Sequence, residues 1–395
     1  MRPIMRPLEG YRVLAVEHAV AAPLCTRHLA DLGAEVIKIE RPGGGDFARG
    51  YDHFVQGQSS FFVWLNRGKR SLTLDVKHPE GRVVLDRLAG QVDVVVQNLA
   101  PGAATRLGLG HAALAARNPR VVVCDISGYG ESGPFARKKA YDLLIQAESG
   151  LISVTGTAGE PSRVGISIAD IATGMYAQTA VLAALLRRER TGAGAHVAVA
   201  MLDALAEWMS ASIYRWGYAG SLTERMPTSH PLLVPYGAHR AKDGTVIFGL
   251  QNEREWASFC TAVLERPELA TDPRFAGNAA RCANRAALTG LIEAFFADRT
   301  VVQVVALLDR AGIANGRLNT AQEVWGHPQL AARDRWREVA TEAGMVRALL
   351  PPVTFADTEA PMGAVPALGA DTEAVLGELG CSAREIARLR KAGAV

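Results

Sequence analysis

Apolar residues along the first half of the chain follow two spacings, which predict different elements. Short runs rich in β-branched residues predict buried strands at 11–17, 35–39, 71–74, 92–95 and 121–126. Between these runs, apolar residues recur at helical spacing, which predicts helices at 23–32, 79–88 and 112–117. Continuous apolar strands that alternate with helices are typical of a parallel sheet covered on both faces.

The second half of the chain changes in texture. Long alanine-rich helices come first, then short strands and short helices, then strand-like segments again from residue 338 and a helical tail. The clearest predicted elements are helices at 171–188 and 202–214 and strands at 195–200, 234–239 and 245–250.

The length of 395 residues exceeds what one hydrophobic core usually holds, so two domains are expected. The change in texture places a large domain at 1–220, a small domain at 221–335, and a return to the large domain with the tail at 336–395. The pattern alone therefore predicts an α/β protein with two domains.

Charge and cysteine content narrow the class of protein. The net charge is only +3 and the charges are interspersed, so no nucleic-acid partner is expected. Five scattered cysteines favour a reducing compartment, and dispersed histidines predict no metal site. The first residues lack the apolar core of a signal peptide, and apolar runs such as 181–186 are too short to cross a bilayer. We expect a cytoplasmic protein with no membrane partner.

A glycine loop at 128–133 (GYGESG) follows a predicted strand and matches the spacing of a dinucleotide-binding fingerprint. In such a fingerprint the glycines open a helix whose N-terminus meets the pyrophosphate. Here Pro134 and a basic run follow at once, and the nearest helical pattern begins around residue 140. We therefore expect no dinucleotide at this loop.

Several short motifs occur in an order that resembles one enzyme family. They include LGAEVIKIERPGGGDFAR, LNRGKRSLTLDVKHPEG, VVVQNLAPGAATRLGLG, ISGYGESGPF, AYDLLIQAESGLISVTG, ADIATGMYAQTAVLAALLRRERTGAGAHVAVAMLDA and LGADTEAVLGELG. Over essentially its whole length the chain resembles the class III CoA-transferases, which include formyl-CoA transferase and carnitine CoA-transferase. The resemblance implies a Rossmann-like large domain with an inserted small α+β domain. It also implies an interlocked, ring-like homodimer that takes acyl-CoA and small carboxylic acids as substrates and holds no permanent cofactor.

The catalytic aspartate of that family corresponds to Asp170 in ISIADIATGMY. A carboxylate can attack a thioester and form a mixed anhydride, after which CoA thiolate forms an aspartyl-CoA thioester. The residue alone, without the resemblance, would also suit a simple N-terminal helix cap. Asp142, next to Tyr141, could be a second acid or merely a helix-starting residue.

The resemblance also implies a CoA-binding site. This sequence departs from the family at Val20, because family members often have a glutamine at that position. The corresponding positions here are Ala19, Val20, Ala21, Arg41, Leu74, Lys77, Asn98, Leu99, Ala100, Arg106, Lys139, Tyr141 and Met201. Cations among them suit the phosphates of CoA.

The same fold hosts α-methylacyl-CoA racemases, whose catalytic histidine would stand immediately before Asp142. That position is Tyr141 here, which favours a transferase, although His18 or His53 could supply a base. A CoA-binding protein without activity would have no use for Asp170 at the thioester.

Residues 228–256 resemble the subgroup that acts on succinyl-, itaconyl-, mesaconyl- or citramalyl-CoA, although Pro231 departs from its pattern. The predicted reaction moves CoA from succinyl-CoA to a C4–C5 dicarboxylate, or, as the alternative, between the two carboxylates of one mesaconyl-CoA. A dicarboxylate needs a cation for its distal carboxylate. The candidates are Arg49, His53, Arg163 and His230.

Overall fold

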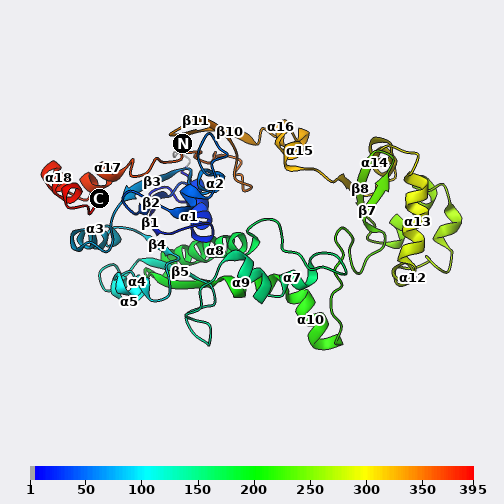
Figure 1. Ribbon diagram of the computed structural model, residues 1–395, viewed down its shortest axis with the longest axis horizontal. Helices are drawn as coiled ribbons and strands as arrows, with labels where there is room; N and C mark the ends of the chain where they lie inside the picture. Colours follow the sequence, from blue (N-terminus) through cyan, green and yellow to red (C-terminus); the bar gives the residue numbers. More distant parts are fainter. Residues whose placement is uncertain (1–4) are drawn as a thin grey trace. The chain divides into compact units, whose positions relative to one another are not determined.

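The computed structural model describes residues 5–395, which form two compact units (Figure 1). The first unit comprises residues 5–151, Arg163–Ala211 and Ala332–Val395, and the second comprises Ile152–Ser162 and Ser212–Ala331. A unit inserted into a larger one was expected, but the predicted boundary after residue 220 lies inside the second unit. Residues 152–162 join that unit because the Arg225 guanidinium donates to the carbonyls of Ser153, Thr157 and Ala158.

A six-stranded sheet forms the centre of the first unit, and all its neighbouring strands are parallel. Its strands are β1 (Arg12–Val16), β2 (Glu35–Glu40), β3 (Lys69–Thr73), β4 (Val94–Gln97), β5 (Val122–Ser127) and β6 (Ala195–Ala200). In the spatial order β3-β2-β1-β4-β5-β6, the chain runs outward from β1 through β2 to β3 on one side, and from β4 through β5 to β6 on the other. The order therefore reverses between β1 and β4. In such sheets ligands bind at the carboxyl ends of the strands, beside this switch point.

Alternating side chains of these strands build two separate cores. Leu14, Ile37 and Val95 pack on one face with α3 (Pro79–Ala89) and with the C-terminal helices α17 (Thr372–Glu378) and α18 (Ala383–Lys391). Val13, Val36 and Val94 pack on the other face against α1 (Ala21–Asp31) and α8 (Ile168–Thr191). Both faces are therefore covered, and the C-terminal tail belongs to the fold (Figure 1).

The remaining helices of the first unit are short. The predicted helix at 202–214 is interrupted at Met209, which ends one helix before the next begins. A hairpin of β10 (Trp336–Thr341) and β11 (Gly344–Leu349) follows the second unit. The short helices are η1 (Phe47–Gly50), α2 (Ser60–Asn66), α4 (Ala103–Arg106), α5 (His111–Ala115), α6 (Asp142–Glu148) and α9 (Met201–Trp208). Helices α7 (Leu151–Val154) and α10 (Ser210–Ala219) lie mostly in the second unit.

The second unit has a core of its own, in which Phe248, Trp256 and Phe259 are almost fully buried. It holds an antiparallel sheet of β7 (Tyr236–Ala241), β8 (Gly244–Gly249) and β9 (Asn315–Arg317). The helices of this region are α11 (Glu253–Ser258), η2 (Phe259–Val263), η3 (Pro267–Ala270), α12 (Asn278–Ala283), α13 (Arg285–Phe296), α14 (Val301–Arg310), α15 (Ala321–Trp325) and α16 (Pro328–Ala332).

Helix α8 is the one helix within residues 5–395 whose length and hydropathy would allow it to cross a membrane. Here it is a core helix. Ala177, Val181 and Ala184 are buried in the core on one sheet face, and Gln178 bonds to His28 of α1. Packing inside the first unit therefore explains part of its apolar composition, while Met175 and Leu186 are exposed.

Candidate active site

Asp170 lies in the first turn of α8, but it does not cap that helix. The N-cap residue is Ser167, which makes no capping bond through its side chain. Instead Asp142 Oδ1 accepts the backbone N–H groups of Ala169 at 2.8 Å and of Asp170 at 3.4 Å. A carboxylate at this place satisfies free N–H groups and complements the helix dipole. Asp142 is thus the capping residue of α8 as well as the first residue of α6, and the Asp170 carboxylate is left for other chemistry.

Gln146 holds the carboxylate of Asp142 in this position. Its Nε2 donates to Asp142 Oδ2 at 2.7 Å, and its Oε1 accepts the Val164 N–H at 2.9 Å. The Gln146 side chain is fully buried, so both bonds are shielded from water. Helix α6 therefore fixes the segment that leads into Asp170.

Burial is the main cause that raises the pKa of Asp170, from 3.8 to about 7, and the negative charge of Asp142 raises it further. The backbone N–H of Ala21 opposes this shift because it stabilises the carboxylate. Burial, followed by the carboxylates of Asp46 and Asp170, raises the pKa of Tyr51 to about 12. The charge of Asp170 therefore acts on Tyr51, a residue that the sequence analysis did not identify.

Ala21 reaches Asp170 because α1 and α8 touch at a glycine. A Cβ atom on Gly174 would lie 2.6 Å from the Ala21 carbonyl oxygen and 3.0 Å from Leu24 Cβ. Real Cβ atoms do not approach backbone oxygens so closely, so only glycine permits this crossing. The close crossing brings the first turn of α1 beside the first turn of α8, where Asp170 stands.

Asn98 joins the loops that follow β1 and β4. Its Oδ1 accepts the His18 N–H at 2.9 Å, and its Nδ2 donates to the His18 carbonyl at 2.9 Å. Gln97 Oε1 accepts the Leu99 N–H at 2.7 Å and so orders the second loop. Asn98 thus positions the turn at 18–21 at the switch point of the sheet.

Glu17, Lys38, Lys69 and Asp46 form a buried ionic cluster next to that turn, and the sequence analysis did not identify it. The Glu17 carboxylate is fully buried and accepts bonds from Lys69 Nζ at 2.7 Å, Thr26 Oγ1 at 2.7 Å and Lys38 Nζ at 3.2 Å. The two ammonium groups outweigh the effect of burial and hold the pKa of Glu17 at about 2. The sequence does contain a sign of this cluster: Glu17 follows an apolar strand directly, and Lys38 lies inside one.

Comparison with known proteins decides the family. The family model of CoA-transferase family III matches residues 8–372. The chain belongs to CoA-transferase family III. Succinyl-CoA:glutarate CoA-transferase of Mus musculus is 36% identical over 82% of this chain and 75% of that protein. Succinyl-CoA–D-citramalate CoA-transferase of Chloroflexus aurantiacus is 35% identical over 83% of this chain and 82% of that protein. The crystal structure of a CaiB/BaiF family protein from Brucella suis has a TM-score of 0.84 and 35% sequence identity, and covers 95% of this chain and 100% of that one.

This class III CoA-transferase places most of its predicted CoA contacts in loops after β1, β2, β3 and β4, at one edge of the sheet. Four of the predicted contacts are exposed cations: Arg41, Lys77, Arg106 and Lys139. Ala100 is exposed and Leu99 is partly buried. Leu74 is fully buried in a core, and Met201 packs with Ile145 and Ala169, so both side chains serve packing.

The glycine loop of the enzyme has a packing role. No helix follows its glycines, since α6 begins only at Asp142. A Cβ atom on Gly128 would lie 2.2 Å from the Ala140 Cβ. Gly128 therefore lets the chain return against the end of β5, which places the exposed Lys139 and Tyr141 beside α6.

The candidate cations for a distal carboxylate have different surroundings. Arg49 donates from Nε and Nη2 to Glu40 at 2.8 and 2.7 Å and stacks on Phe62, so it has a structural role. Arg163 is exposed, and His53 is exposed beside the Gly57 carbonyl. His230 belongs to the second unit and stacks on Tyr236 with ring centroids 5.3 Å apart.

Asp125, Glu131 and His196 bring possible metal-ligand atoms within 4.8 Å of one another. The Asp125 carboxylate already accepts a bond from Gln97 Nε2 at 2.8 Å and contacts His196 Nε2 at 2.8 Å. These contacts link β4, β5 and β6, and we assign the group that structural role.

The glycine crossing gives a testable prediction. We expect Gly174→Ala to separate α1 from α8, to lower turnover about tenfold or more, and to cost ~1–3 kcal/mol of stability through overpacking. Steady-state kinetics and urea unfolding measure the two effects. Gly290→Ala on α13 is the matched control, because its new Cβ meets no atom within 4 Å. Unchanged turnover in Gly174→Ala would contradict the role of the crossing.

Proposed function

We propose that this enzyme transfers CoA from succinyl-CoA to a C4–C5 dicarboxylate such as itaconate, mesaconate or citramalate, with Asp170 as the nucleophile. The observation that carries the proposal is the Asp170 carboxylate, with its pKa raised to about 7 at the start of a helix that another acid already caps. A less stabilised carboxylate is the stronger nucleophile. The relatives that act on glutarate and D-citramalate support a dicarboxylate acceptor.

In the first half of the proposed reaction, an oxygen of Asp170 attacks the thioester carbonyl and the C–S bond breaks. This step gives an acyl-aspartyl anhydride and CoA thiolate. The thiolate then attacks the aspartyl carbonyl, which releases the donor acid and forms an aspartyl-CoA thioester. The acceptor carboxylate reverses both steps, so that the new acyl-CoA leaves and the Asp170 carboxylate returns. The Ala21 N–H stabilises the Asp170 carboxylate before the attack and after its return.

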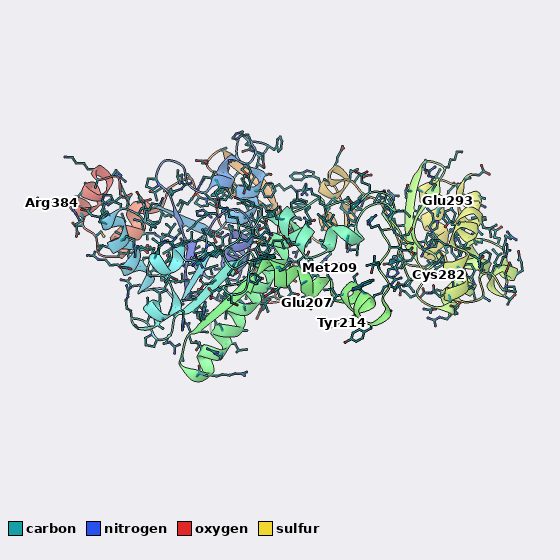
Figure 2. The ribbon with its side chains drawn as sticks, turned by 60° about the horizontal axis from the view of Figure 1, so that its bottom comes forward. Glu207, Met209, Tyr214, Cys282, Glu293 and Arg384 are labelled. Carbon is teal, nitrogen blue, oxygen red and sulfur yellow. The ribbon has the colours of Figure 1, made fainter. Side chains whose placement is uncertain are left out.

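We also propose that the enzyme is an interlocked homodimer that works in the cytoplasm. Ile213, Tyr214, Trp216 and Tyr218 of α10 are all largely exposed, and the Tyr214 side chain projects from that helix (Figure 2). Large aromatic side chains are enriched at protein interfaces. All five cysteines are free thiols, which suits a reducing compartment. Light scattering during size-exclusion chromatography tests the dimer, and a monomer would contradict it.

Peptide mass spectrometry after mixing with succinyl-CoA tests the proposed nucleophile. We expect a hydroxylamine-sensitive adduct on the peptide that contains Asp170, and no adduct in Asp170→Ala. If the adduct were absent and protons α to the thioester exchanged instead, a racemase would be the better assignment. Incubation of mesaconyl-CoA without an acceptor tests the intramolecular alternative. Only transfer of CoA between the two carboxylates of one molecule would then move the thioester to the other carboxylate.

A further inference from the structure

The turn between β1 and α1 contains a residue in an unfavourable backbone conformation. Ala19 has a φ of 63°, in the left-handed region that residues with a Cβ adopt at an energetic cost. Such a conformation persists only where surrounding contacts impose it. Two contacts do so here: Asn98 bonds to both the N–H and the carbonyl of His18, and Asp46 Oδ1 accepts the Ala19 N–H at 3.3 Å.

Asp46 is itself held firmly. Its Oδ2 accepts Lys38 Nζ at 2.9 Å, and its own N–H donates to Glu40 Oε2 at 3.0 Å. Its carboxylate and the Lys38 ammonium are almost fully buried. Gly45 makes this turn possible, because its φ is 62° and a Cβ there would lie 2.7 Å from Glu40 Oε2. Asp46 is thus a fixed acceptor that belongs to the buried ionic cluster.

The strained turn leads directly to the reacting group. Ala19 is followed by Val20, the N-cap residue of α1, and then by Ala21, the first residue of that helix, whose N–H lowers the pKa of Asp170. We propose that Asp46 is a positioning residue, which holds the strained Ala19 turn so that the Ala21 N–H points at the Asp170 carboxylate. This inference rests on the proposed role of Asp170 as nucleophile. It gives a function to the GGGDFAR motif, which has no contact with substrate in the proposed mechanism.

Removal of this acceptor has a defined consequence. In Asp46→Asn, an amide cannot accept bonds from both Lys38 and Ala19 through its two terminal atoms, since one of them is now a donor. Ala19 is then free to relax to a negative φ, which turns the Ala21 N–H away from Asp170. Glycine adopts a positive φ without cost, so Ala19→Gly removes the reason to relax.

The experiment compares four variants with the wild type: Asp46→Asn, Ala19→Gly, the double variant, and Asp31→Asn as a control. Asp31 is also a buried acid, paired with Arg27 at 3.1 Å and Arg67 at 2.9 Å. It ends the 11-residue helix α1, which places it roughly 15 Å along the axis from Ala21. Each variant is measured for kcat and KM in CoA transfer, and for the pH dependence of carbodiimide labelling of the Asp170 peptide.

We expect Asp46→Asn to lower kcat about tenfold with little change in KM, while Asp31→Asn keeps the wild-type kcat. The labelling midpoint should rise in Asp46→Asn, because Asp170 loses a donor to its ionised form. In the double variant, Ala19→Gly should restore part of the lost kcat and bring the labelling midpoint part of the way back to the wild-type value. The proposal is overturned if Asp46→Asn behaves as Asp31→Asn does, if its labelling midpoint does not rise, or if Ala19→Gly restores nothing. The labelling arm needs no turnover, so it tests the positioning role even if CoA transfer through Asp170 fails.

Discussion

Asp170→Asn is expected to abolish CoA transfer, with a loss of about 10⁴-fold or more in turnover. The amide is nearly isosteric, but it cannot form the anhydride, so substrate binding remains while the chemistry stops. Chromatographic assay of the acyl-CoA product, together with the binding of CoA, measures the two parts separately. Asp142→Asn is a companion variant. It should shift the pH–rate profile to lower pH, because the charge that raises the pKa of Asp170 is gone. It should also lower transfer in part, because one acceptor of the Gln146 amide becomes a donor. Residual transfer of a tenth or more in Asp170→Asn would rule out this nucleophile.

Asp170→Asn should also stabilise the fold. The gain depends on pH, and its sign follows from the raised pKa of Asp170. Folding moves the pKa of Asp170 from 3.8 to about 7, so the wild type loses stability as the pH rises through that window. Asparagine does not ionise. Its advantage should therefore grow between pH 5 and pH 8, toward ~2–4 kcal/mol. Urea unfolding at both values measures the difference, and an advantage independent of pH would contradict the burial of this carboxylate.

Glu17→Gln is expected to cost ~3–5 kcal/mol of stability, because it leaves the buried ammonium groups of Lys38 and Lys69 without their shared carboxylate. Folding lowers the pKa of Glu17 from 4.5 to about 2, so its contribution is complete above pH 4.5 and is lost as the pH falls toward 2. The wild type and the variant should therefore approach each other in stability at acidic pH. Denaturant unfolding across this range measures both effects.

Two further variants make that test specific. Glu189→Gln removes a surface partner of Arg120, 3.4 Å away and about half exposed, and should cost less than about 1 kcal/mol. Glu17→Gln combined with Lys69→Met should recover part of the lost stability, since one unpaired charge disappears with its desolvation cost. An equal loss in Glu17→Gln and Glu189→Gln would mean that the cluster is not buried in solution.

Much of the fold could be predicted from the sequence. The strand predicted at 195–200 has the bounds of β6, and the helix predicted at 79–88 ends one residue before α3 does, because both depend on local apolar spacing. Asp170 was found through the motif around it. The ion pair of Arg49 with Glu40 could not be predicted, because the charge of Arg49 is visible in the sequence and its partner is not.

The sequence by itself determined the alternating β-α pattern, the change in texture after residue 220 and the family motifs, since each is a property of neighbouring residues. Only the tertiary structure decided which side chains surround Asp170. Asp142 caps the helix of Asp170 from 27 positions away, and Asn98 holds His18 from 80 positions away. Glu17 meets Lys69 across 52 positions. The pairs of Asn98 with His18 and of Glu17 with Lys69 form only when the strand order β3-β2-β1-β4-β5-β6 brings the ends of distant strands together, and hydrophobic periodicity carries no information about that order.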